Sequence, residues 1–542
     1  MKKKSNTEQT QNHKLNRNLL LAISCFEGGA VMIIELVGAK IIAPFYGTSL
    51  YVWSSVLGVT LAALAFGYFA GGYISKKYPG EWTLFLALFV GGSFAMIAPV
   101  IGPSIMQATD GFGVKVGSLI SVFIFLFPSI SCMGMVSPMI IQLINKDIAG
   151  AGSSAGTVYA ISTVGGILAT FLAGFYLIPE WGIILTSYII GGILLSISAI
   201  YFIKTMKWNF LGMEAIMVVI LLLANPEHAL TSDNTAILYS KVGILGEWTV
   251  VEFNVPSKDG SVSKEKKLLL NGIDQTYTQT GHEPLSLWNY PHQLGAYSSC
   301  KPKGSKALLL GMGGGSIVHE LVSMDLEVDV VELDQNVEYI SKTYFNYDET
   351  KSNLYIDDAR HFIRTADKKY DIVIMDLVLG EVQPAHVFSL EGFQELKEII
   401  NEDAIVIINF QGVLEIPEYS QGPKSIYRTL QEAGFYVDYY YPYAINPEEH
   451  LTQDMFFLAS LSDLDYKSLL QNVRYNEWFP YDNFYYEDLI QERPLDVSDA
   501  LILTDDKPKL ELINSSSILN WRKNKINQNI KRLMDEKLSL YK

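Results

Sequence analysis

The stretch ALLLGMGGGSIVHELVSMDLEVDVVELD, residues 307–334, decides the fold of the second half of this chain. An apolar run of strand length leads through a glycine-rich loop into a helical pattern, and a second apolar run ends at Glu332 and Asp334. Glycines let such a loop turn sharply and approach a ligand closely at a helix N-terminus. An acidic residue about 20 positions further on can accept hydrogen bonds from ribose hydroxyls. The stretch therefore predicts a strand–loop–helix unit that holds a nucleoside.

The flanking sequence extends this unit into alternating strands and helices. Apolar runs of strand length occur at residues 307–310, 328–333, 353–356, 371–375 and 404–410. Such runs, separated by helices, are typical of a parallel sheet covered on both faces. The third run ends at Asp358, where a carboxylate can meet an adenine amino group, and the fourth ends at Asp376. This acidic series favours an S-adenosyl nucleoside over a dinucleotide.

We therefore expect an α/β Rossmann-like domain of the S-adenosylmethionine-dependent methyltransferase type over residues 284–515. Short strand patterns precede it, with a polar turn at residues 257–260, and predict a small β-strand subdomain over residues 231–283.

The first half of the chain is a series of long uncharged segments. Runs long enough to cross ~30 Å of hydrocarbon lie near residues 18–44, 50–74, 82–103, 116–144, 153–178 and 181–203, with a shorter seventh at 208–224. Small residues such as Gly67 and Gly71 let helices in such segments approach closely. We expect a multi-pass α-helical membrane domain of about seven helices over residues 18–230, after a basic tail of residues 1–17. The expected location is the cell membrane.

Basic residues lie on alternate connections of this half, at positions 2–4, 76–77, 146 and 204–207. The positive-inside rule assigns these connections to the cytoplasm. Seven full crossings would then place the second half outside the cell. We expect that the short seventh segment does not cross fully, which keeps the second half cytoplasmic. A re-entrant segment elsewhere and an external domain are the alternatives.

Charge also separates the two halves. The chain of 542 residues has a net charge of −16, whereas its first 230 residues carry 12 Lys and Arg against 9 Asp and Glu. The negative excess therefore lies in the second half, which favours cationic partners and argues against nucleic acid. Solubility is the alternative explanation of this acidity. The three cysteines form no metal-binding spacing, so no metal site is expected.

Two carboxylates, Glu27 and Glu35, lie inside the first apolar segment. Ionisable residues at membrane depth are costly and often mark a pathway or a site. For Glu35, a functional role and an internal ion pair are equally open.

Several motifs of the second half, taken together, resemble the spermidine synthase (polyamine aminopropyltransferase) family. These motifs are Leu270-Asn-Gly-Ile-Asp-Gln275, Tyr290-Pro-His292, the glycine loop, Val331-Glu-Leu-Asp334, Asp358-Ala-Arg360 and Asp371-Ile-Val-Ile-Met-Asp376. The whole chain is similar to membrane-fused relatives, in which a multi-helix half precedes the synthase-like domain. Residues 503–508 resemble a motif common in those relatives.

The resemblance implies a role for individual residues. Those implied to bind the cofactor-like co-substrate, decarboxylated S-adenosylmethionine, are Gln275, His292, Gly311, Gly313, Gly315, Glu332 and Asp358. Tyr290, Asp505 and Asp506 would contact a small cationic amine such as putrescine. Asp376 would be the general base. The implied reaction transfers an aminopropyl group to the amine and releases methylthioadenosine, and a homodimer is expected because family members often form one.

Two positions depart from the family pattern. Family enzymes carry an Asp where this chain has Gly314 and a second Asp where it has Leu379. Both departures remove negative charge from the part of the pocket that handles amines. A donor that keeps its carboxylate, ordinary S-adenosylmethionine, would then meet less repulsion. A methyltransferase is therefore one alternative function, and a non-enzymatic nucleoside-sensing transporter or regulator is another.

Some of these residues also have a structural explanation. Asp334 is expected to cap the helix that follows it, and His292 could brace a helix. Asp505 and Asp506 could form a turn before Pro508. The basic tail of residues 516–542 predicts an amphipathic helix, which would lie on an anionic membrane surface or pack against its own domain or a second subunit.

Overall fold

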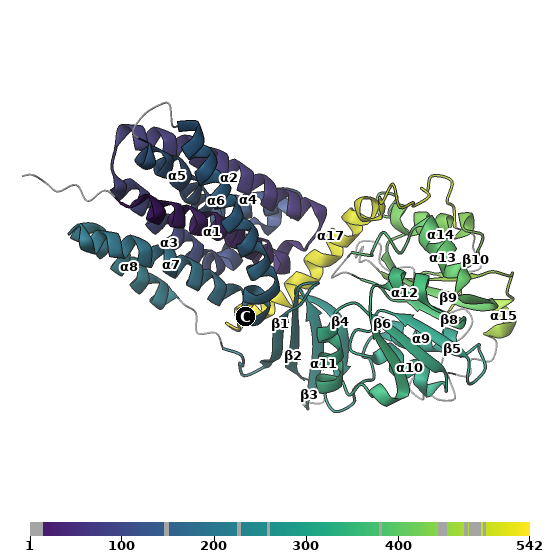
Figure 1. Ribbon diagram of the computed structural model, residues 1–542. Coiled ribbons are helices and arrows are strands. Elements are labelled where there is room, and N and C mark those ends of the chain that lie inside the picture. Colours follow the sequence, from purple (N-terminus) through teal and green to yellow (C-terminus); the bar gives the residue numbers. More distant parts are fainter. Residues whose placement is uncertain are drawn as a thin grey trace, which may run out of the picture. The chain divides into compact units, whose positions relative to one another are not determined.

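The computed structural model describes residues 15–145, 151–224, 229–256, 261–378, 382–442, 453–470, 475, 489–490 and 495–541. The chain forms two compact units (Figure 1). One comprises Met1–Ile42, Leu50–Pro226 and Lys542, and the other comprises Ala43–Ser49 and Glu227–Tyr541. The basic residues expected at positions 2–4 and 146, and the turn expected at 257–260, lie outside the described residues.

The first unit is helical. Its elements are α1 (Arg17–Tyr46), α2 (Leu50–Lys77), α3 (Glu81–Thr109), η1 (Asp110–Phe112), α4 (Gly113–Phe125), α5 (Phe127–Ile144), α6 (Ala151–Leu172), the π-helical η3 (Ala173–Trp181), α7 (Gly182–Lys204) and α8 (Trp208–Ala224). By length and composition, five helical runs of the described chain could cross a membrane, namely residues 17–46, 50–77, 81–125, 127–144 and 152–204. The expected segment at 116–144 is divided at Leu126, because Pro128 starts a new helix.

Glycines bring the helices of this unit into close contact. A Cβ atom on Gly67 would lie 2.4 Å from the carbonyl oxygen of Ser131, and one on Gly71 would lie 2.6 Å from that of Met135. Both contacts join α2 to α5, so any larger residue would push these helices apart. This is the close packing that the Gly67–Gly71 spacing predicts.

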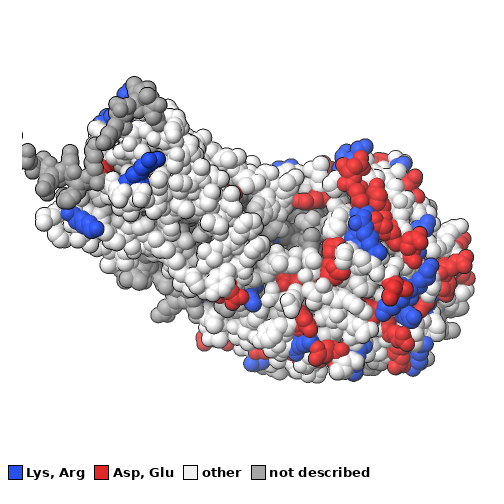
Figure 2. Space-filling model, in the orientation of Figure 1, with Lys and Arg blue, Asp and Glu red and all other residues white. Residues whose placement is uncertain are grey.

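Few charged side chains lie on the visible face of the helical unit (Figure 2). Large apolar side chains point outward instead, such as Phe69 and Phe175, which are 76% and 78% exposed. Such a surface suits an apolar surrounding rather than water.

The second unit begins with a small antiparallel sheet of four strands in the order β1-β2-β3-β4. The strands are β1 (Thr235–Val242), β2 (Glu247–Pro256), β3 (Val262–Leu270) and β4 (Ile273–Gln279). Asn271 and Gly272 join β3 to β4 with positive φ angles of 49° and 79°. This two-residue turn is of the kind that hairpins favour. The sheet is the predicted β-strand subdomain.

A seven-stranded sheet follows, in the order β10-β11-β9-β8-β5-β6-β7. Its strands are β5 (Lys306–Leu310), β6 (Glu327–Glu332), β7 (Ser352–Ile356), β8 (Tyr370–Met375), β9 (Ile400–Gly412), β10 (Tyr436–Tyr440) and β11 (Gln453–Ser460). Strands β5 to β9 pair in parallel and match the five predicted runs, whereas β11 pairs antiparallel with β9 and β10. The predicted Rossmann-like fold is confirmed, and the antiparallel pair is an addition to it.

Alternate side chains of this sheet enter two separate cores. Leu309, Val330 and Ile374 pack under helices α9 (Asn289–Ser298), α10 (Ser316–Ser323) and α11 (Gln335–Tyr344). Leu310, Val331 and Val373 pack on the other face under α12 (Ala359–Thr365), α13 (Leu390–Glu398) and α14 (Gln421–Glu432). Figure 1 shows α10 on one side of the sheet and α13 and α14 on the other. Because both faces are covered, functional side chains are left to the carboxyl edge of the parallel strands.

The C-terminal tail packs on the second unit. It forms α17 (Leu510–Gln528) and α18 (Ile530–Asp535). The buried Leu533 and Leu538 share an apolar cluster with Ile237, Val251 and Phe253 of the small sheet. Of the expected alternatives, the structure shows packing of the tail against its own domain. The remaining short elements are η4 (Glu349–Lys351) and α15 (Tyr466–Leu469).

Candidate active site

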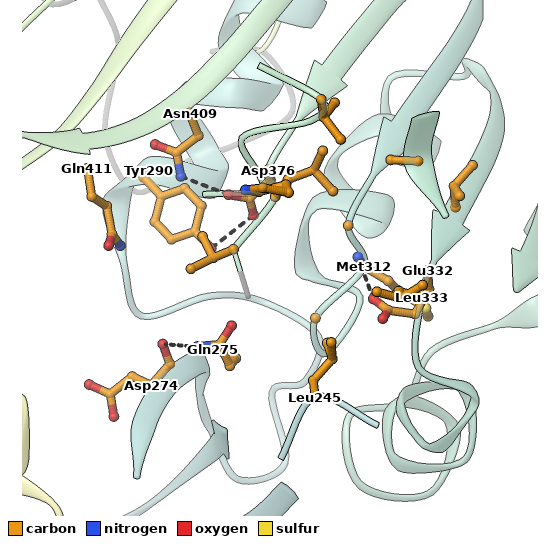
Figure 3. A pocket seen from close by; sticks show the side chains of 18 of the residues that line it. Leu245, Asp274, Gln275, Tyr290, Met312, Glu332, Leu333, Asp376, Asn409 and Gln411 are labelled. Carbon is orange, nitrogen blue, oxygen red and sulfur yellow. Dashed lines mark hydrogen bonds between the residues drawn. The ribbon is translucent and has the colours of Figure 1, made fainter. Parts of the chain in front are cut away.

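A cavity lies at the carboxyl edge of the parallel strands (Figure 3). Its wall combines the loop after β5, the ends of β6 and β8, the end of β9, the start of β11, and residues of β4, α9 and α17. Of the predicted residues, those in the wall are Gln275, Tyr290, Gly311, Gly313, Glu332, Asp358 and Asp376. The motifs that resemble one family thus converge on one place.

The glycine loop lets two strand ends approach each other. Gly311 has a φ angle of 92°, and a Cβ atom there would lie 2.2 Å from the carbonyl oxygen of Asp376. Gly313 and Gly315 also have positive φ angles, of 53° and 91°, and Gly315 is the N-cap of α10. Glycine at these positions avoids backbone strain, and at Gly311 it also avoids a clash.

Glu332 ends β6 with its carboxylate held by backbone donors. Its two oxygens accept hydrogen bonds from the amides of Met312, at 3.1 Å, and Asp334, at 2.9 Å. Burial raises the pKa of this carboxyl group to about 7. Asp334 accepts a hydrogen bond from the amide of Asn336 at 3.0 Å, which confirms the expected N-cap. A carboxylate fixed beside the glycine loop is suited to accept hydrogen bonds from ribose hydroxyls.

Asp358 lies after β7, on the same wall. Its carboxylate caps α12 by accepting from the amides of Arg360 and His361, both at 3.0 Å, and lies 3.1 Å from His386 Nε2. Burial opposes ionisation, but the His361 amide and His386 lower the pKa of Asp358 below its usual value. An ionised acceptor at this position is suited to the predicted contact with an adenine amino group, which stays a prediction.

Asp376 follows β8 and faces the cavity. Asn409 Nδ2 donates to its Oδ1 at 2.9 Å, and the Tyr290 hydroxyl donates to its Oδ2 at 3.4 Å (Figure 3). Burial, together with the nearby negative charge of Asp454, raises the pKa of Asp376 to about 6. A carboxylate with a pKa near neutrality is suited to accept a proton.

Asp274 and Gln275, near the start of β4, line the cavity next to the hairpin turn. Gln275 Nε2 donates to the carbonyl oxygen of Asp274 at 3.2 Å. The Asp274 carboxylate lies 3.2 Å from Lys267 Nζ and 2.9 Å from Lys525 Nζ, and it accepts from Asn529 at 2.8 Å. Burial opposes ionisation here too, but the two lysines lower the pKa of Asp274. The negative charge of Asp274 is therefore balanced within the protein.

Four predicted residues of the second half lie outside the wall, namely Gly315, which caps α10, and three residues whose side chains have other contacts. His292 is buried in a network with Glu320 at 2.8 Å and the Tyr475 hydroxyl at 2.9 Å, where it braces α9 instead of facing the cavity. Asp505 pairs with Arg360 at 2.6 Å, and Asp506 accepts from the Thr504 hydroxyl at 2.6 Å. The structure thus gives these three residues structural contacts, because motif position does not determine which way a side chain points.

The two carboxylates of α1 are both buried in the helical unit. Glu27 accepts hydrogen bonds from the hydroxyls of Ser137 and Ser162, both at 3.3 Å. Glu35 is 9% exposed. Their function remains a prediction.

Sequence reasoning missed several residues of the wall, including Trp288, Asn409, Gln411, Asp454, Trp521 and Lys525. Asn409 and Gln411 end a predicted strand, so their position at the carboxyl edge was a usable signal. Asp454 belongs to the unpredicted antiparallel strand β11. Trp521 and Lys525 come from α17, whose apolar spacing does not reveal which surface it covers.

Gly314, where the family has an Asp, is closely surrounded. Its amide donates to the Thr276 hydroxyl at 2.7 Å, and a Cβ atom there would lie 2.7 Å from Thr276 Cγ2 and 3.1 Å from Phe345 Cγ. The Thr276 side chain therefore occupies the space that a larger residue would need. Leu379, the second departure, lies outside the described residues.

Restoring the family residue alone is expected to destabilise the second unit. Gly314→Asp should cost about 1–3 kcal/mol of the free energy of unfolding, because Thr276 must move. The double variant Gly314→Asp/Thr276→Ala should recover most of the lost Tm, with Thr276→Ala alone as the control. Thermal denaturation of the purified variants checks this, and a Gly314→Asp protein as stable as wild type would contradict it.

The second unit is similar in sequence to a known protein family. Residues 292–458 match the family described as Spermine/spermidine synthase domain. Polyamine aminopropyltransferase 2 of Aquifex aeolicus is 27% identical over 433 residues, which cover 76% of this chain and 82% of that protein. Since the second unit is shorter than this match, the similarity extends into the helical half.

Two further matches cover less. The N-terminal histidine N-methyltransferase of Emericella nidulans is 29% identical over 118 residues, so the chain spans only 21% of that relative's length. The crystal structure of spermidine synthase from Thermotoga maritima is 19% identical, with a TM-score of 0.33 and coverage of 42% of this chain and 73% of that chain. The C-terminal half of this chain thus contains a spermine/spermidine synthase domain at residues 292–458, which supports its assignment as a transferase.

Proposed function

We propose that the second unit transfers an aminopropyl group from decarboxylated S-adenosylmethionine to a primary amine such as putrescine and releases methylthioadenosine. One observation carries this proposal. A proton-accepting carboxylate, Asp376, and a ribose-binding carboxylate, Glu332, lie in the wall of the same cavity, with the glycine loop between them. Nucleoside and amine would therefore meet at the end of β8.

The residues of the wall fit this co-substrate. Glu332 would bind the ribose hydroxyls and Asp358 the adenine amino group, while the glycine loop leaves room for the nucleoside. The bound sulfonium supplies an activated carbon and a good leaving group. The amine nitrogen would bond to that carbon as the carbon–sulfur bond breaks, and its proton would pass to Asp376. Asn409 and Tyr290 orient the carboxylate for this step.

Mass spectrometry of the purified full-length protein tests the proposal. The protein is incubated with putrescine and either decarboxylated or ordinary S-adenosylmethionine. Spermidine and methylthioadenosine, formed only from the decarboxylated donor, are the expected products. A protein that binds methylthioadenosine but yields neither product would overturn the proposal.

Methyl transfer from ordinary S-adenosylmethionine is the second candidate, and Gly314 favours it. The loop offers no carboxylate at this position, and Thr276 fills the space beside it. A donor carboxylate would therefore meet no repulsion there. The similarity to an N-methyltransferase is in line with this candidate. Release of S-adenosylhomocysteine in the same mass-spectrometry experiment would identify it.

We propose further that the helical unit is embedded in the cell membrane and that the second unit lies in the cytoplasm. The five long apolar runs support the first part. A cytoplasmic supply of nucleoside and amine substrates is the argument for the second part. A reporter that is active only in the cytoplasm, fused after Lys542, should be active. A silent fusion in a well-expressed protein would count against this placement.

A further inference from the structure

Asp454 is a carboxylate of the cavity to which neither the motifs nor the proposed mechanism gives a role. It lies near the start of β11, directly opposite Gln411 of β9, and both residues line the cavity. Its negative charge acts on Asp376 and on the Tyr290 hydroxyl, and burial raises its own pKa. Two carboxylates, from strands on either side of β9, thus face the same space. Two negative charges there repel each other unless a cation joins them or one carboxylate takes up a proton.

The other cavity carboxylates already have their partners. Asp274 is held by two lysines, Glu332 by backbone amides, and Asp358 by backbone amides and a histidine. Within the described part of the chain, no Lys, Arg or His lies within ion-pair distance of Asp376 or Asp454. Lys525 acts on Asp454 electrostatically, but its Nζ is bound to Asp274 at 2.9 Å. Among the residues that the structure describes, Asp376 and Asp454 therefore have only neutral hydrogen-bond partners, which are Asn409 and Tyr290 for Asp376 and Gln411 for Asp454.

Asn409 provides an independent sign of a missing partner. This residue of β9 is 6% exposed and lines the cavity between the two strands that carry the carboxylates. Its Nδ2 donates to Asp376, which fixes the orientation of the amide, since the reverse would place Oδ1 against a carboxylate. Oδ1 then accepts no hydrogen bond from any described residue. A buried acceptor without a donor is costly, so a ligand that donates is expected.

We propose that Asp454 and Asn409 Oδ1 form an ammonium subsite that docks the protonated primary amine of the acceptor beside Asp376. An ammonium group has three donors, and here it meets two carboxylates and one amide oxygen. The proton passes to Asp376, whereas Asp454 keeps its negative charge and acts as a positioning residue. Asp454 thus supplies, from another strand, negative charge that Gly314 and Leu379 do not provide. The identity of the acceptor as an amine rests on the proposed function.

Calorimetric titration of the full-length protein with putrescine, in the presence of saturating methylthioadenosine, tests the subsite without turnover. Asp454→Asn should weaken putrescine binding about 10- to 100-fold, as expected for the loss of a charged hydrogen-bond partner. The affinity for methylthioadenosine should stay within about twofold of wild type. Butan-1-ol, which lacks the charge, should not distinguish the two proteins.

The matched control is Asp438→Asn. Asp438 lies on the adjacent strand β10, and burial raises its pKa as it does that of Asp454, but it is not in the cavity wall. This variant should bind putrescine as wild type does. Wild-type affinity in Asp454→Asn, or no putrescine binding by the wild-type protein, would overturn the subsite.

A second variant distinguishes a folding defect in Asp454→Asn from the loss of the ammonium subsite. If Asp454→Asn loses both ligands, Asp454→Glu keeps the charge and should restore the binding of putrescine. Loss of both ligands in Asp454→Glu as well would make Asp454 structural and overturn the proposal. Putrescine binding that depends on Asp454, without formation of spermidine, would instead refute the proposed function and leave the subsite intact.

Discussion

Replacing Asp376 by Asn is expected to lower kcat for spermidine formation by about 10²–10⁴-fold, the usual contribution of a general base. The variant side chain has nearly the same shape and stays within reach of Asn409 and Tyr290. It cannot accept the proton that the attacking amine must lose. The binding of methylthioadenosine should not change, because Glu332 and Asp358 are the residues proposed to hold the nucleoside.

Asp371→Asn is the matched control for this variant. Asp371 is the second residue of the same strand, β8, at the end away from Asp376. It accepts hydrogen bonds from the Lys306 amide at 2.8 Å and from Asn401 Nδ2 at 2.7 Å. It is remote from the cavity wall, so its replacement should leave kcat unchanged. A kcat of Asp376→Asn within about threefold of wild type would rule out Asp376 as the general base.

The same assignment sets the pH dependence of the wild-type enzyme. Asp376 must be ionised to accept a proton, and its pKa is raised to about 6 by burial. Activity should therefore be full above this pH and fall about tenfold per unit below it. Asp376→Asn should lose this acidic limb, and the two pH–rate profiles, recorded with the nucleoside saturating, show whether it does.

The parallel strands and the loop between the first two could be predicted because each follows from local sequence. Buried parallel strands read as apolar runs, and a loop that turns sharply at the end of one needs glycine. Glu332 and Asp376 stood out because each ends such a run. The same edge of the sheet then brings them together, whatever the details of packing.

The remainder of the site depends on tertiary contacts that local sequence does not determine. Asp454 lines the cavity because β11 pairs antiparallel with β9. The sequence of residues 453–460 does not indicate that β9 is the strand with which it pairs. Lys525 reaches Asp274 because α17 packs on its own domain, whereas its composition suits a membrane surface equally well. His292 shows the converse, since its motif position suggested a ligand contact, whereas its side chain lies beside the buried Glu320.

The second large effect is expected at Gly311. Gly311→Ala should lower stability by about 3 kcal/mol and reduce kcat at least 10²-fold, because the new methyl group lies 2.2 Å from the carbonyl oxygen of Asp376. The end of β8 must then shift and move the carboxylate of Asp376, the proposed general base, with it. Backbone strain from the positive φ angle alone should not cause this loss of activity, and Gly281 offers a control for it.

A substitution at Gly281 tests the effect of backbone strain without a steric clash. Its φ angle of 88° is close to the 92° of Gly311, but a Cβ atom at Gly281 would meet no heavy atom of the described structure within 4 Å. Gly281→Ala should therefore show only the cost of the backbone conformation, about 1 kcal/mol, with kcat unchanged. Thermal denaturation and steady-state kinetics of both variants give the two differences. Equal losses of stability and equal kcat values for Gly311→Ala and Gly281→Ala would contradict this prediction. The close approach of the glycine loop to Asp376 would then have no role in positioning the proposed general base.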